Sequence, residues 1–212
     1  MSIPLLLIGG GGHCAACIDV VESSGLFTIA GIVDTIDKIG FSVCGYSVFA
    51  TDADLAELRV SYSNVLITIG QIKSAIIRIK LYDQLKQLGF VLPVITAKSA
   101  VVSRSSSLSD GIIIMHCAVV NSNASLGENC IINTRAIIEH DVCIGAHTHV
   151  STGAIVNGGC RIGNACLVGS GAVLKQGITL ADEVIIGAGS VVIKDVTEPG
   201  VYAGNPARKI CG

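Results

Sequence analysis

The side chains best suited to proton transfer in this sequence are its histidines, and one of them has an acidic neighbour. His140 is followed directly by Asp141. An imidazole titrates near neutral pH, so it can accept a proton from a reacting group, and a carboxylate partner fixes its tautomer and raises its basicity. We therefore predict that His140 is a general base and that Asp141 supports it. His116 and His147 fit no such pattern and are expected to be exposed side chains without a role.

A run of four glycines, residues 9–12, is a second candidate site. It follows the apolar stretch 5–8 and leads through His13 into a helical stretch at 15–24. A strand, a glycine turn and a helix N-terminus bind anions, because bare N–H groups and the helix dipole face the ligand. Asp34 ends the next apolar stretch, where a carboxylate often holds a ribose hydroxyl. Cys14 replaces the last glycine of the dinucleotide fingerprint, which favours a nucleoside diphosphate; the alternative is a tight turn without a ligand.

The elements that carry the histidines follow from a six-residue repeat. Residues 101–196 divide into 16 hexads without insertion, and the second position of every hexad is Val, Leu or Ile. A period of six fits neither a helix nor a simple strand, but it fits a short strand followed by a corner. Three hexads make one triangular coil, so the pattern predicts about five stacked coils of a left-handed parallel β-helix. Cys130, Cys160 and Cys166 share one repeat position with several alanines and are predicted to be small core residues.

The spacing of the histidines bears on where a site can form. His140 and His149 are nine residues apart, which is half of an 18-residue coil, so they are expected on different faces of one subunit. They can share a site only if another subunit supplies one of them, which predicts a trimer with sites at its interfaces. A zinc site of the gamma carbonic anhydrase type is a minority alternative, because the H-x4-H arrangement of those enzymes is missing here and no metal is expected.

The first part of the chain alternates strand and helix patterns. Strands are predicted at residues 5–8, 27–33, 65–69 and 90–95, and helices at 15–24 and 73–88. This order predicts a small parallel α/β sheet of Rossmann-like type. The predicted domains are residues 1–97, an α/β domain that carries the candidate diphosphate site, and 98–212, a β-helix domain ending in a turn-rich cap.

Composition restricts the remaining function classes. Lys and Arg number 14 against 16 Asp and Glu, without a basic run, which argues against nucleic acid as a partner. The apolar start lacks a basic flank, and no apolar run approaches the length of a membrane span, so a cytoplasmic protein without membrane insertion is expected. Nine cysteines, an odd number, suggest reduced thiols. Cys14 and Cys17 form a lone CxxC, which we interpret as two thiols near a helix start.

Several segments together resemble the bacterial sugar O- and N-acyltransferases of the NeuD/PglD type. In the first part these are residues 8–13 (Ile-Gly-Gly-Gly-Gly-His), Asp34 and residues 68–70 (Thr-Ile-Gly). In the β-helix they are residues 133–134, 138–141 and 147–151, and the closing segment is 204–208 (Gly-Asn-Pro-Ala-Arg). The resemblance covers nearly the whole chain.

The resemblance implies transfer of an acetyl group from acetyl-coenzyme A to the amino group of a nucleotide-linked amino-deoxy sugar, with UDP as the expected nucleotide, in a homotrimer. It assigns His140 as the base and Asp141 as its acidic support. His149, Ser170 and Ala188 would contact acetyl-coenzyme A. The implied nucleotide-sugar contacts are Gly11, Gly12, His13, Asp34, Thr35 and Gly70.

The predicted mechanism is direct transfer in a ternary complex, with His140 taking the proton of the attacking amine. Three alternatives remain open at this point. The acceptor could be a sugar hydroxyl, as in sialic acid O-acetylation; the protein could be a metal-dependent hydratase; or it could be a trimeric scaffold that only binds a nucleotide sugar.

Overall fold

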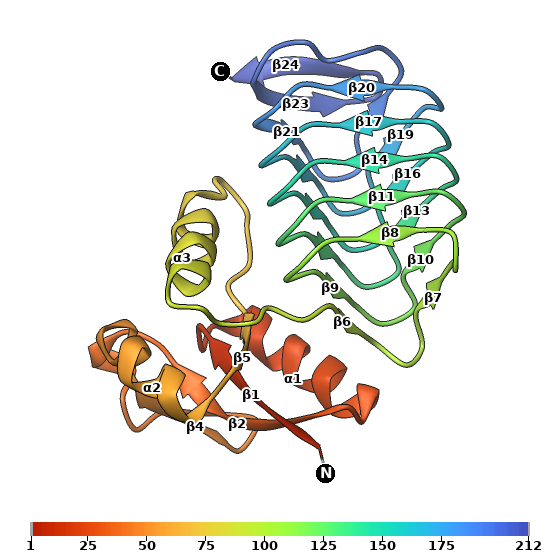
Figure 1. Ribbon diagram of the computed structural model, residues 1–212. Helices are drawn as coiled ribbons and strands as arrows, with labels where there is room; N and C mark the ends of the chain where they lie inside the picture. Colours follow the sequence, from red (N-terminus) through yellow and green to blue (C-terminus); the bar gives the residue numbers. More distant parts are fainter. Residues whose placement is uncertain (1, 212) are drawn as a thin grey trace.

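The computed structural model describes residues 2–211, in which an N-terminal α/β domain packs against a β-helix (Figure 1). The N-terminal sheet has the strand order β3-β4-β2-β1-β5, and every strand is parallel to its neighbour except β3, which pairs antiparallel with β4. Its strands are β1 (Ile3–Ile8), β2 (Phe27–Val33), β3 (Ser42–Val43), β4 (Tyr46–Ala50) and β5 (Asn64–Ile67). The helices are α1 (Gly12–Ser24), α2 (Leu55–Ser61) and α3 (Ile76–Gln87), with 3-10 turns at Ile36–Lys38 and Asp52–Asp54.

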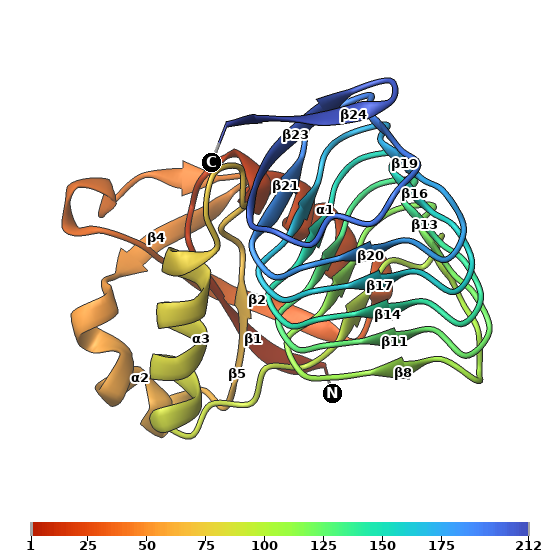
Figure 2. The ribbon, with the colours of Figure 1, turned by 90° about the horizontal axis from the view of Figure 1, so that it is seen from above.

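Both faces of this sheet are covered, as the continuous apolar strands require. Leu5 and Leu7 of β1 belong to a core shared with α1, whereas Leu6 and Ile8 belong to a core shared with α2 and α3. Successive side chains of a strand point to opposite faces, so β1 alone separates the two layers. Figure 2 shows α1 on one side of the sheet and α2 and α3 on the other.

The predicted N-terminal elements are largely confirmed, with two corrections. The strand at 27–33 is found as predicted, and the helix predicted at 15–24 begins earlier, at Gly12. The strand predicted at 90–95 is wrong, because this segment makes only a single bridge, Val91 to Asn64, before a strand begins at Ile95. The β3–β4 hairpin and α2 were not predicted, since residues 35–63 carry neither a clear apolar period nor a strong turn signal.

Sixteen strands, one for each predicted hexad, build the β-helix, so the left-handed parallel β-helix is confirmed. Strand β6 (Ile95–Thr96) precedes the first hexad, just before the predicted domain boundary, and pairs with β9. Paired strands are 18 residues apart, for example Val119 opposite Ile137. The first residue of each strand points outward, so each of the three sheets carries one outward-facing column of side chains. Two sheets are named here after the chemistry of that column, and the third is named domain-facing because the α/β domain packs on it.

The domain-facing sheet contains β6, β9 (Ile113–Ile114), β12 (Ile131–Ile132), β15 (His149–Val150), β18 (Leu167–Val168), β21 (Val184–Ile186) and the hairpin strands β23 (Gly200–Gly204) and β24 (Ala207–Cys211). The aliphatic sheet contains β7 (Val101–Val102), β10 (Val119–Val120), β13 (Ile137–Ile138), β16 (Ile155–Val156), β19 (Val173–Leu174) and β22 (Val191–Val192). The polar sheet contains β8 (Ser107–Leu108), β11 (Ser125–Leu126), β14 (Cys143–Ile144), β17 (Arg161–Ile162) and β20 (Thr179–Leu180).

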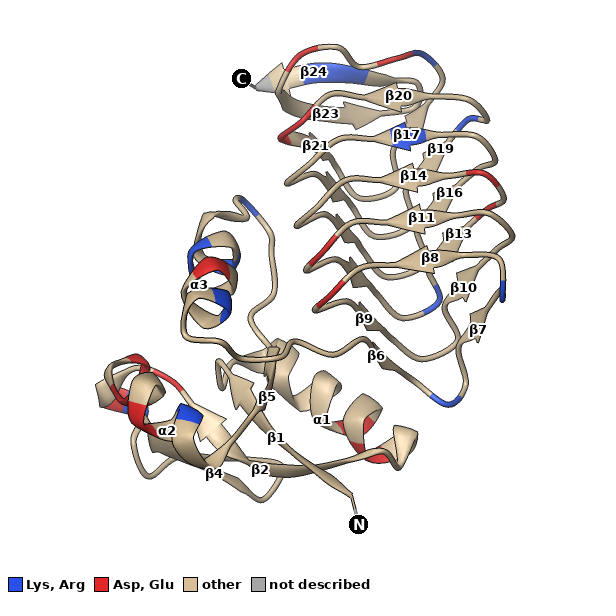
Figure 3. Ribbon diagram, viewed as in Figure 1, with Lys and Arg blue, Asp and Glu red and all other residues tan. Residues whose placement is uncertain are grey.

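The interior of the β-helix is one aliphatic column. The second hexad position and the small residue at the sixth position point inward together, and Cys130, Cys160 and Cys166 lie fully buried among alanines and valines, as predicted. The eight cysteines outside Cys211 are all free thiols in the part of the chain that the structure describes. Figure 3 shows that charged residues are sparse on the strands and lie mainly at the corners, with Arg161 in β17 as an exception.

The α/β domain is attached through α1, which packs on the domain-facing sheet. Cys14, Cys17 and Ile18 of α1 share a buried core with Ile113 and Ile131 of that sheet. The remaining outward positions of the sheet, His149, Leu167 and Ile185, extend beyond α1 toward the cap. No helix among the described residues is long and apolar enough to cross a membrane.

Candidate functional site

The glycine loop between β1 and α1 is shaped by close packing on one side and is open on the other. Gly9 has a φ of 106°, and a Cβ there would come within 2.4 Å of the Ile69 side chain, so only glycine fits. Gly11 and Gly12 have no atom within 4 Å of the position of a Cβ. No side chain caps the N-terminus of α1; the Cys14 N–H donates to the Gly11 carbonyl oxygen at 2.9 Å, and the N–H groups before it are available to a ligand.

A cavity of about 480 Å³ opens beside this loop. It brings together most of the predicted nucleotide-sugar residues at the carboxyl ends of β1, β2 and β5, which is where open α/β sheets bind ligands. The lining residues are Gly9, Gly11, Gly12, His13, Asp34, Lys38, Thr68, Ile69, Gly70 and Ile72. Cys14 does not line this cavity, because its side chain is fully buried in the core beneath α1.

The Asp34 carboxylate is fully engaged within the protein. Its Oδ2 accepts hydrogen bonds from the Gly10 N–H at 2.6 Å and from Lys38 Nζ at 2.9 Å, while its Oδ1 accepts from the Thr35 N–H at 2.7 Å. Partial burial opposes ionisation, but these hydrogen bonds outweigh it and hold the pKa of Asp34 below its usual value. Asp34 therefore fixes the glycine loop and orients the ammonium group of Lys38, which is the only Lys or Arg lining the cavity.

Two histidines, the half-buried His13 and the buried His149, connect the cavity to the β-helix. The rings of His13 and His149 are 6.4 Å apart, centroid to centroid. Burial, together with the positive charge of Arg78, lowers the pKa of each to about 4, so both are neutral at physiological pH. His149 Nε2 lies 3.0 Å from Asn133 Nδ2, and His149 Nδ1 lies 3.0 Å from the Gln71 carbonyl oxygen.

The two other predicted coenzyme contacts lie on the first corner, by which we mean the turns from the domain-facing sheet to the aliphatic sheet. Thr152, Ser170 and Ala188 are exposed there, each one coil above the last. Ser170 Oγ lies 2.9 Å from Ser151 Oγ, two residues beyond His149. His149, Ser170 and Ala188 thus follow one edge of the β-helix, which begins beside the cavity.

His140 and Asp141 lie elsewhere, on the second corner, between β13 and β14. Figure 1 shows this loop on the side of the β-helix away from the α/β domain. His140 Nδ1 is 2.8 Å from Asp141 Oδ2, and both side chains are more than half exposed. The hydrogen bonds with His140 and, secondarily, Asn123 lower the pKa of Asp141. The predicted separation of His140 and His149 onto different faces of one chain is confirmed.

The expectation for His147 is wrong. Its side chain is only 13% exposed, because it packs edge-on against Tyr82 of α3, with ring centroids 5.4 Å apart. His147 Nδ1 also lies 3.0 Å from Asn129 Nδ2. Contacts with a helix distant in sequence carry no six-residue signal, so the repeat alone could not predict this burial. His116 is partly covered and lies 3.2 Å from Ser99 Oγ.

Sequence reasoning missed three residues at the candidate site, Lys38, Gln71 and Arg78, and it noticed Asn133 only as part of a segment that carries the family resemblance. Lys38 follows Asp34 by one helical turn, a spacing that could have been noticed. Gln71 and Arg78 act across the junction between domain and β-helix, which the sequence does not show. Asn133 contacts His149 within the β-helix. Among the described residues, no cluster of three or more His, Cys, Asp or Glu side chains could hold a metal ion.

Comparison with known proteins places this geometry in a family. The sequence pattern of the PglD N-terminal domain matches residues 4–85, and that of the six-repeat bacterial transferase hexapeptide matches residues 159–194. A variant of perosamine N-acetyltransferase from Caulobacter crescentus, solved with CoA and GDP-perosamine, is 31% identical with a TM-score of 0.92, covering 99% of this chain and 97% of that one. The protein belongs to the PglD-type family of sugar acyltransferases.

Two further solved structures support this membership. PerB from Caulobacter crescentus, in complex with CoA and GDP-perosamine, is 33% identical with a TM-score of 0.91 over 98% of this chain and 97% of that chain. The acetyltransferase domain of PglB from Neisseria gonorrhoeae, in complex with acetyl coenzyme A, is 31% identical with a TM-score of 0.90 over 99% and 100%. No curated protein sequence gives a significant match. The predicted resemblance to the NeuD/PglD type is confirmed.

Proposed function

We propose that the protein transfers an acetyl group from acetyl-coenzyme A to the amino group of a UDP- or GDP-linked amino-deoxy sugar. The observation that carries this proposal is the contact between His13 and His149, because it joins the cavity beside the glycine loop to the first corner of the β-helix. Relatives 31–33% identical to this chain are acetyltransferases, and those solved with an acceptor hold GDP-perosamine together with CoA.

In this proposal the nucleotide sugar occupies the cavity of the α/β domain. The N–H groups at the start of α1, beside Gly11 and Gly12, and the Lys38 ammonium group bind the diphosphate. Gly70 lines this cavity and Thr35 lies at its edge, where its N–H donates to Asp34, while Asp34 positions the loop and Lys38. The sugar then extends past His13 toward His149.

Acetyl-coenzyme A lies along the first corner, with its pantetheine arm beside Ser170 and Ala188 and its thioester near His149. The exposed corner residues, repeated once per coil, provide an extended edge that suits a long thin arm. His149 is neutral, so it presents no charge to the thioester.

The general base is His140 of the partner subunit in a homotrimer. The aliphatic sheet presents an outward column of six β-branched residues that the chain itself covers only in part: Val101, Val119, Ile137, Ile155, Val173 and Val191. This sheet lies between the first and second corners. Three-fold packing of aliphatic sheets therefore brings the second corner of one subunit, with His140, against the first corner of the next.

The reaction proceeds by direct transfer. The sugar amine attacks the thioester carbonyl carbon and forms the C–N bond, while the Nε2 of His140 takes a proton from the nitrogen. Backbone N–H groups stabilise the oxyanion. The C–S bond then breaks, and the proton passes from His140 to the departing sulfur. Asp141 holds Nδ1 throughout, so the lone pair at Nε2 faces the amine.

A thiol-release assay tests this function. Purified protein is mixed with acetyl-coenzyme A and a panel of GDP-, UDP- and dTDP-linked 4-amino sugars, with free sialic acid as a hydroxyl acceptor. We expect turnover with one of the nucleotide amino sugars, and the relative rates identify which nucleotide the acceptor carries. Turnover with sialic acid alone would move the reaction to O-acetylation, and binding of coenzyme A without turnover on any acceptor would contradict the proposal.

Shared sites are tested separately by co-expressing two inactive variants. His140→Ala removes the base, and Gly11→Val fills the open side of the glycine loop. Each variant alone is expected to be inactive, whereas mixed trimers regain part of the activity, because an intact cavity then faces an intact His140. Absence of recovery in verified mixed trimers would place the whole site within one chain.

A further inference from the structure

A single arginine is buried at the junction of the α/β domain and the β-helix. Arg78 of α3 is only 2% exposed, and among the described residues it forms no ion pair with an acidic side chain. Burial lowers the pKa of its guanidinium to about 10, so the group remains charged at neutral pH. A buried charge without a counter-charge is costly, so an apolar side chain would give a more stable junction. The contacts of Arg78 therefore call for another explanation than stability.

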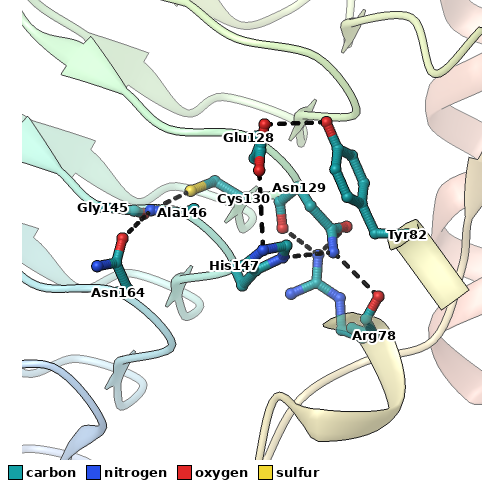
Figure 4. A network of polar contacts seen from close by, with 9 residues as sticks. All are labelled: Arg78, Tyr82, Glu128, Asn129, Cys130, Gly145, Ala146, His147 and Asn164. Atoms are coloured by element: carbon teal, nitrogen blue, oxygen red, sulfur yellow. Dashed lines mark hydrogen bonds and ion pairs between the residues drawn. The ribbon is translucent and has the colours of Figure 1, made fainter. Parts of the chain in front are cut away.

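The guanidinium binds both parts of the molecule at once. Its Nη2 donates to Asn129 Oδ1 at 2.9 Å and to the Asn129 carbonyl oxygen, and Asn129 Nδ2 donates back to the Arg78 carbonyl oxygen at 3.3 Å. Figure 4 shows Arg78 reaching from α3 to Asn129. Its Nη1 donates to Gln71 Oε1 at 3.1 Å. Arg78 thus fixes Gln71 against a corner of the β-helix.

Gln71 in turn touches the site from two directions. Its Nε2 donates to the carbonyl oxygen of Cys166 at 3.1 Å, which ties it to the β-helix. Its own carbonyl oxygen accepts a hydrogen bond from His149 Nδ1 at 3.0 Å. Gln71 follows directly after Gly70, which lines the cavity beside the glycine loop.

These contacts determine which nitrogen of His149 carries the proton. The Asn133 Oδ1 accepts from the Thr134 N–H at 2.7 Å, so its Nδ2 is the atom that faces His149 Nε2. An amide nitrogen only donates, and the Gln71 carbonyl oxygen only accepts. His149 is therefore neutral, with its proton on Nδ1 and its Nε2 lone pair directed to Asn133.

We propose that Arg78 is a positioning residue for acetyl transfer, which acts through Gln71 to hold His149 in one tautomer and to fix the cavity relative to the first corner. The two substrates of the proposed reaction bind on opposite sides of this junction, so their relative placement depends on it. Small errors in such placement reduce the rate of reaction strongly. This inference rests on the proposed function, but part of its test does not.

The test compares variants at the two linked positions with a matched control. Arg78→Met keeps the length of the side chain and removes its hydrogen bonds; Arg78→Lys keeps the charge but cannot reach Gln71 and Asn129 together. Gln71→Leu removes the link and spares the arginine. The control is Tyr82→Phe, one turn along the same helix, which loses the 3.1 Å hydrogen bond to Glu128 but no contact to Gln71.

We expect kcat to fall about tenfold or more in Arg78→Met, Arg78→Lys and Gln71→Leu, with the KM of each substrate changed less than about threefold. The Arg78→Met, Gln71→Leu double variant should lose little more than either single one, because both break the same link. Tyr82→Phe should keep its kcat. Three results would overturn the proposal: a wild-type kcat in Arg78→Lys, additive losses of kcat in the double variant, or a loss of kcat in Tyr82→Phe as large as that in Arg78→Met.

A second measurement needs no turnover. The ¹⁵N chemical shifts of His149 in selectively labelled protein should report the Nδ1–H tautomer in the wild type and a mixture of tautomers in Gln71→Leu, a variant chosen because its buried arginine is intact. An unmixed Nδ1–H tautomer in the folded variant would overturn the proposal. If the wild-type protein transfers acetyl to no acceptor while the tautomer responds as expected, the proposed function fails and the structural link remains.

Discussion

His140 and Asp141 are consecutive in the chain, yet their side chains are hydrogen bonded, with 2.8 Å between Nδ1 and Oδ2. Neighbouring residues seldom face each other in this way. The contact is possible because Asp141 has a φ of 60°, which turns the chain sharply at the second corner. Asn123, one coil below, donates a second hydrogen bond to Asp141 Oδ1 at 3.2 Å. The pair is thus oriented without help from the α/β domain.

Removing the imidazole should reduce kcat more than removing its partner. We expect His140→Ala to lower kcat by about 10²–10⁴-fold, the usual contribution of a general base. Asp141→Asn keeps the shape but loses the charge, and should lower kcat by about tenfold. His116→Gln, in the same β-helix, serves as the control and should leave the rate of thiol release unchanged. Near-normal turnover of His140→Ala would remove the residue from the mechanism.

Gly158 sets the place of the His140 ring. A Cβ at this position would lie 2.6 Å from His140 Nε2, closer than real contacts allow. The φ of Gly158 is not in the left-handed region, so alanine is tolerated by the backbone and the fold should persist. We expect Gly158→Ala to displace the ring and lower kcat by about tenfold or more, while circular dichroism and melting temperature stay close to wild type. Normal kcat in a folded variant would contradict this.

Lys38 should affect the nucleotide sugar and not acetyl-coenzyme A. Lys38→Met removes the only cation of the cavity, so we expect the KM of the nucleotide sugar to rise by about tenfold, as for loss of a charge-assisted hydrogen bond. The KM of acetyl-coenzyme A should not change. Lys86→Met serves as the control, because it removes the same charge from α3, where Lys86 forms an exposed ion pair with Asp110 of the β-helix. Equal effects of the two variants would point to overall charge instead of a specific contact.

Acid should destabilise the junction between the domains. The unfolded chain binds protons at His13 and His149 with pKa values near 6.5, whereas burial lowers both to about 4 in the folded protein. Between pH 6.5 and 4 the unfolded state holds more protons, so the free energy of unfolding decreases as the pH falls, by at most about 1.4 kcal/mol per unit for each histidine. Urea unfolding at pH 7 and pH 5 measures the slope. His149→Gln should reduce it, and an unchanged slope would argue against this cause.

Charge on the aliphatic sheet should prevent trimer formation. Ile137→Asp places a carboxylate in the column that we propose to be buried between subunits, and we expect monomers in sedimentation or light scattering. Ser125→Asp, at the same strand position on the polar sheet, should leave the assembly intact. A trimeric Ile137→Asp variant would exclude this sheet from the interface. Loss of activity should accompany loss of the trimer, because the proposed site needs His140 of the partner subunit.

The sequence predicted the repeated strands of the β-helix, but it did not predict the contacts between the α/β domain and the β-helix. Every hexad from Val101 onward became a strand at the expected place, because burial of one aliphatic side chain in every hexad leaves a strict period. Residues whose role depends on a neighbour distant in the chain left no such trace. Arg78 looks like an ordinary helix residue, and Gln71 like part of a loop. Both are buried only because α3 is placed beside the β-helix.

The same limit explains the mixed outcome at the candidate site. The glycine loop was recognised because four glycines in a row between a strand and a helix are a local pattern, and Gly9 cannot be replaced without striking Ile69. Asp34 was noticed by position, but its hydrogen bonds to Gly10 and Lys38 depend on the packing of two strands. The burial of His147 depends on Tyr82 in the same way. Local chemistry can be inferred from spacing, whereas partners across a junction require the fold.

The residues of the first corner are also spaced at a fixed interval along the β-helix. Thr152, Ser170 and Ala188 recur once per coil, and adjacent coils are about 4.8 Å apart, the spacing of neighbouring strands. Any molecule lying along this edge meets the same type of corner at regular steps, starting from His149. Adding or removing whole coils changes the length of this edge without turning any face of the β-helix. In the binding mode that we propose for acetyl-coenzyme A, the number of coils between His149 and the cap sets the length of donor that fits.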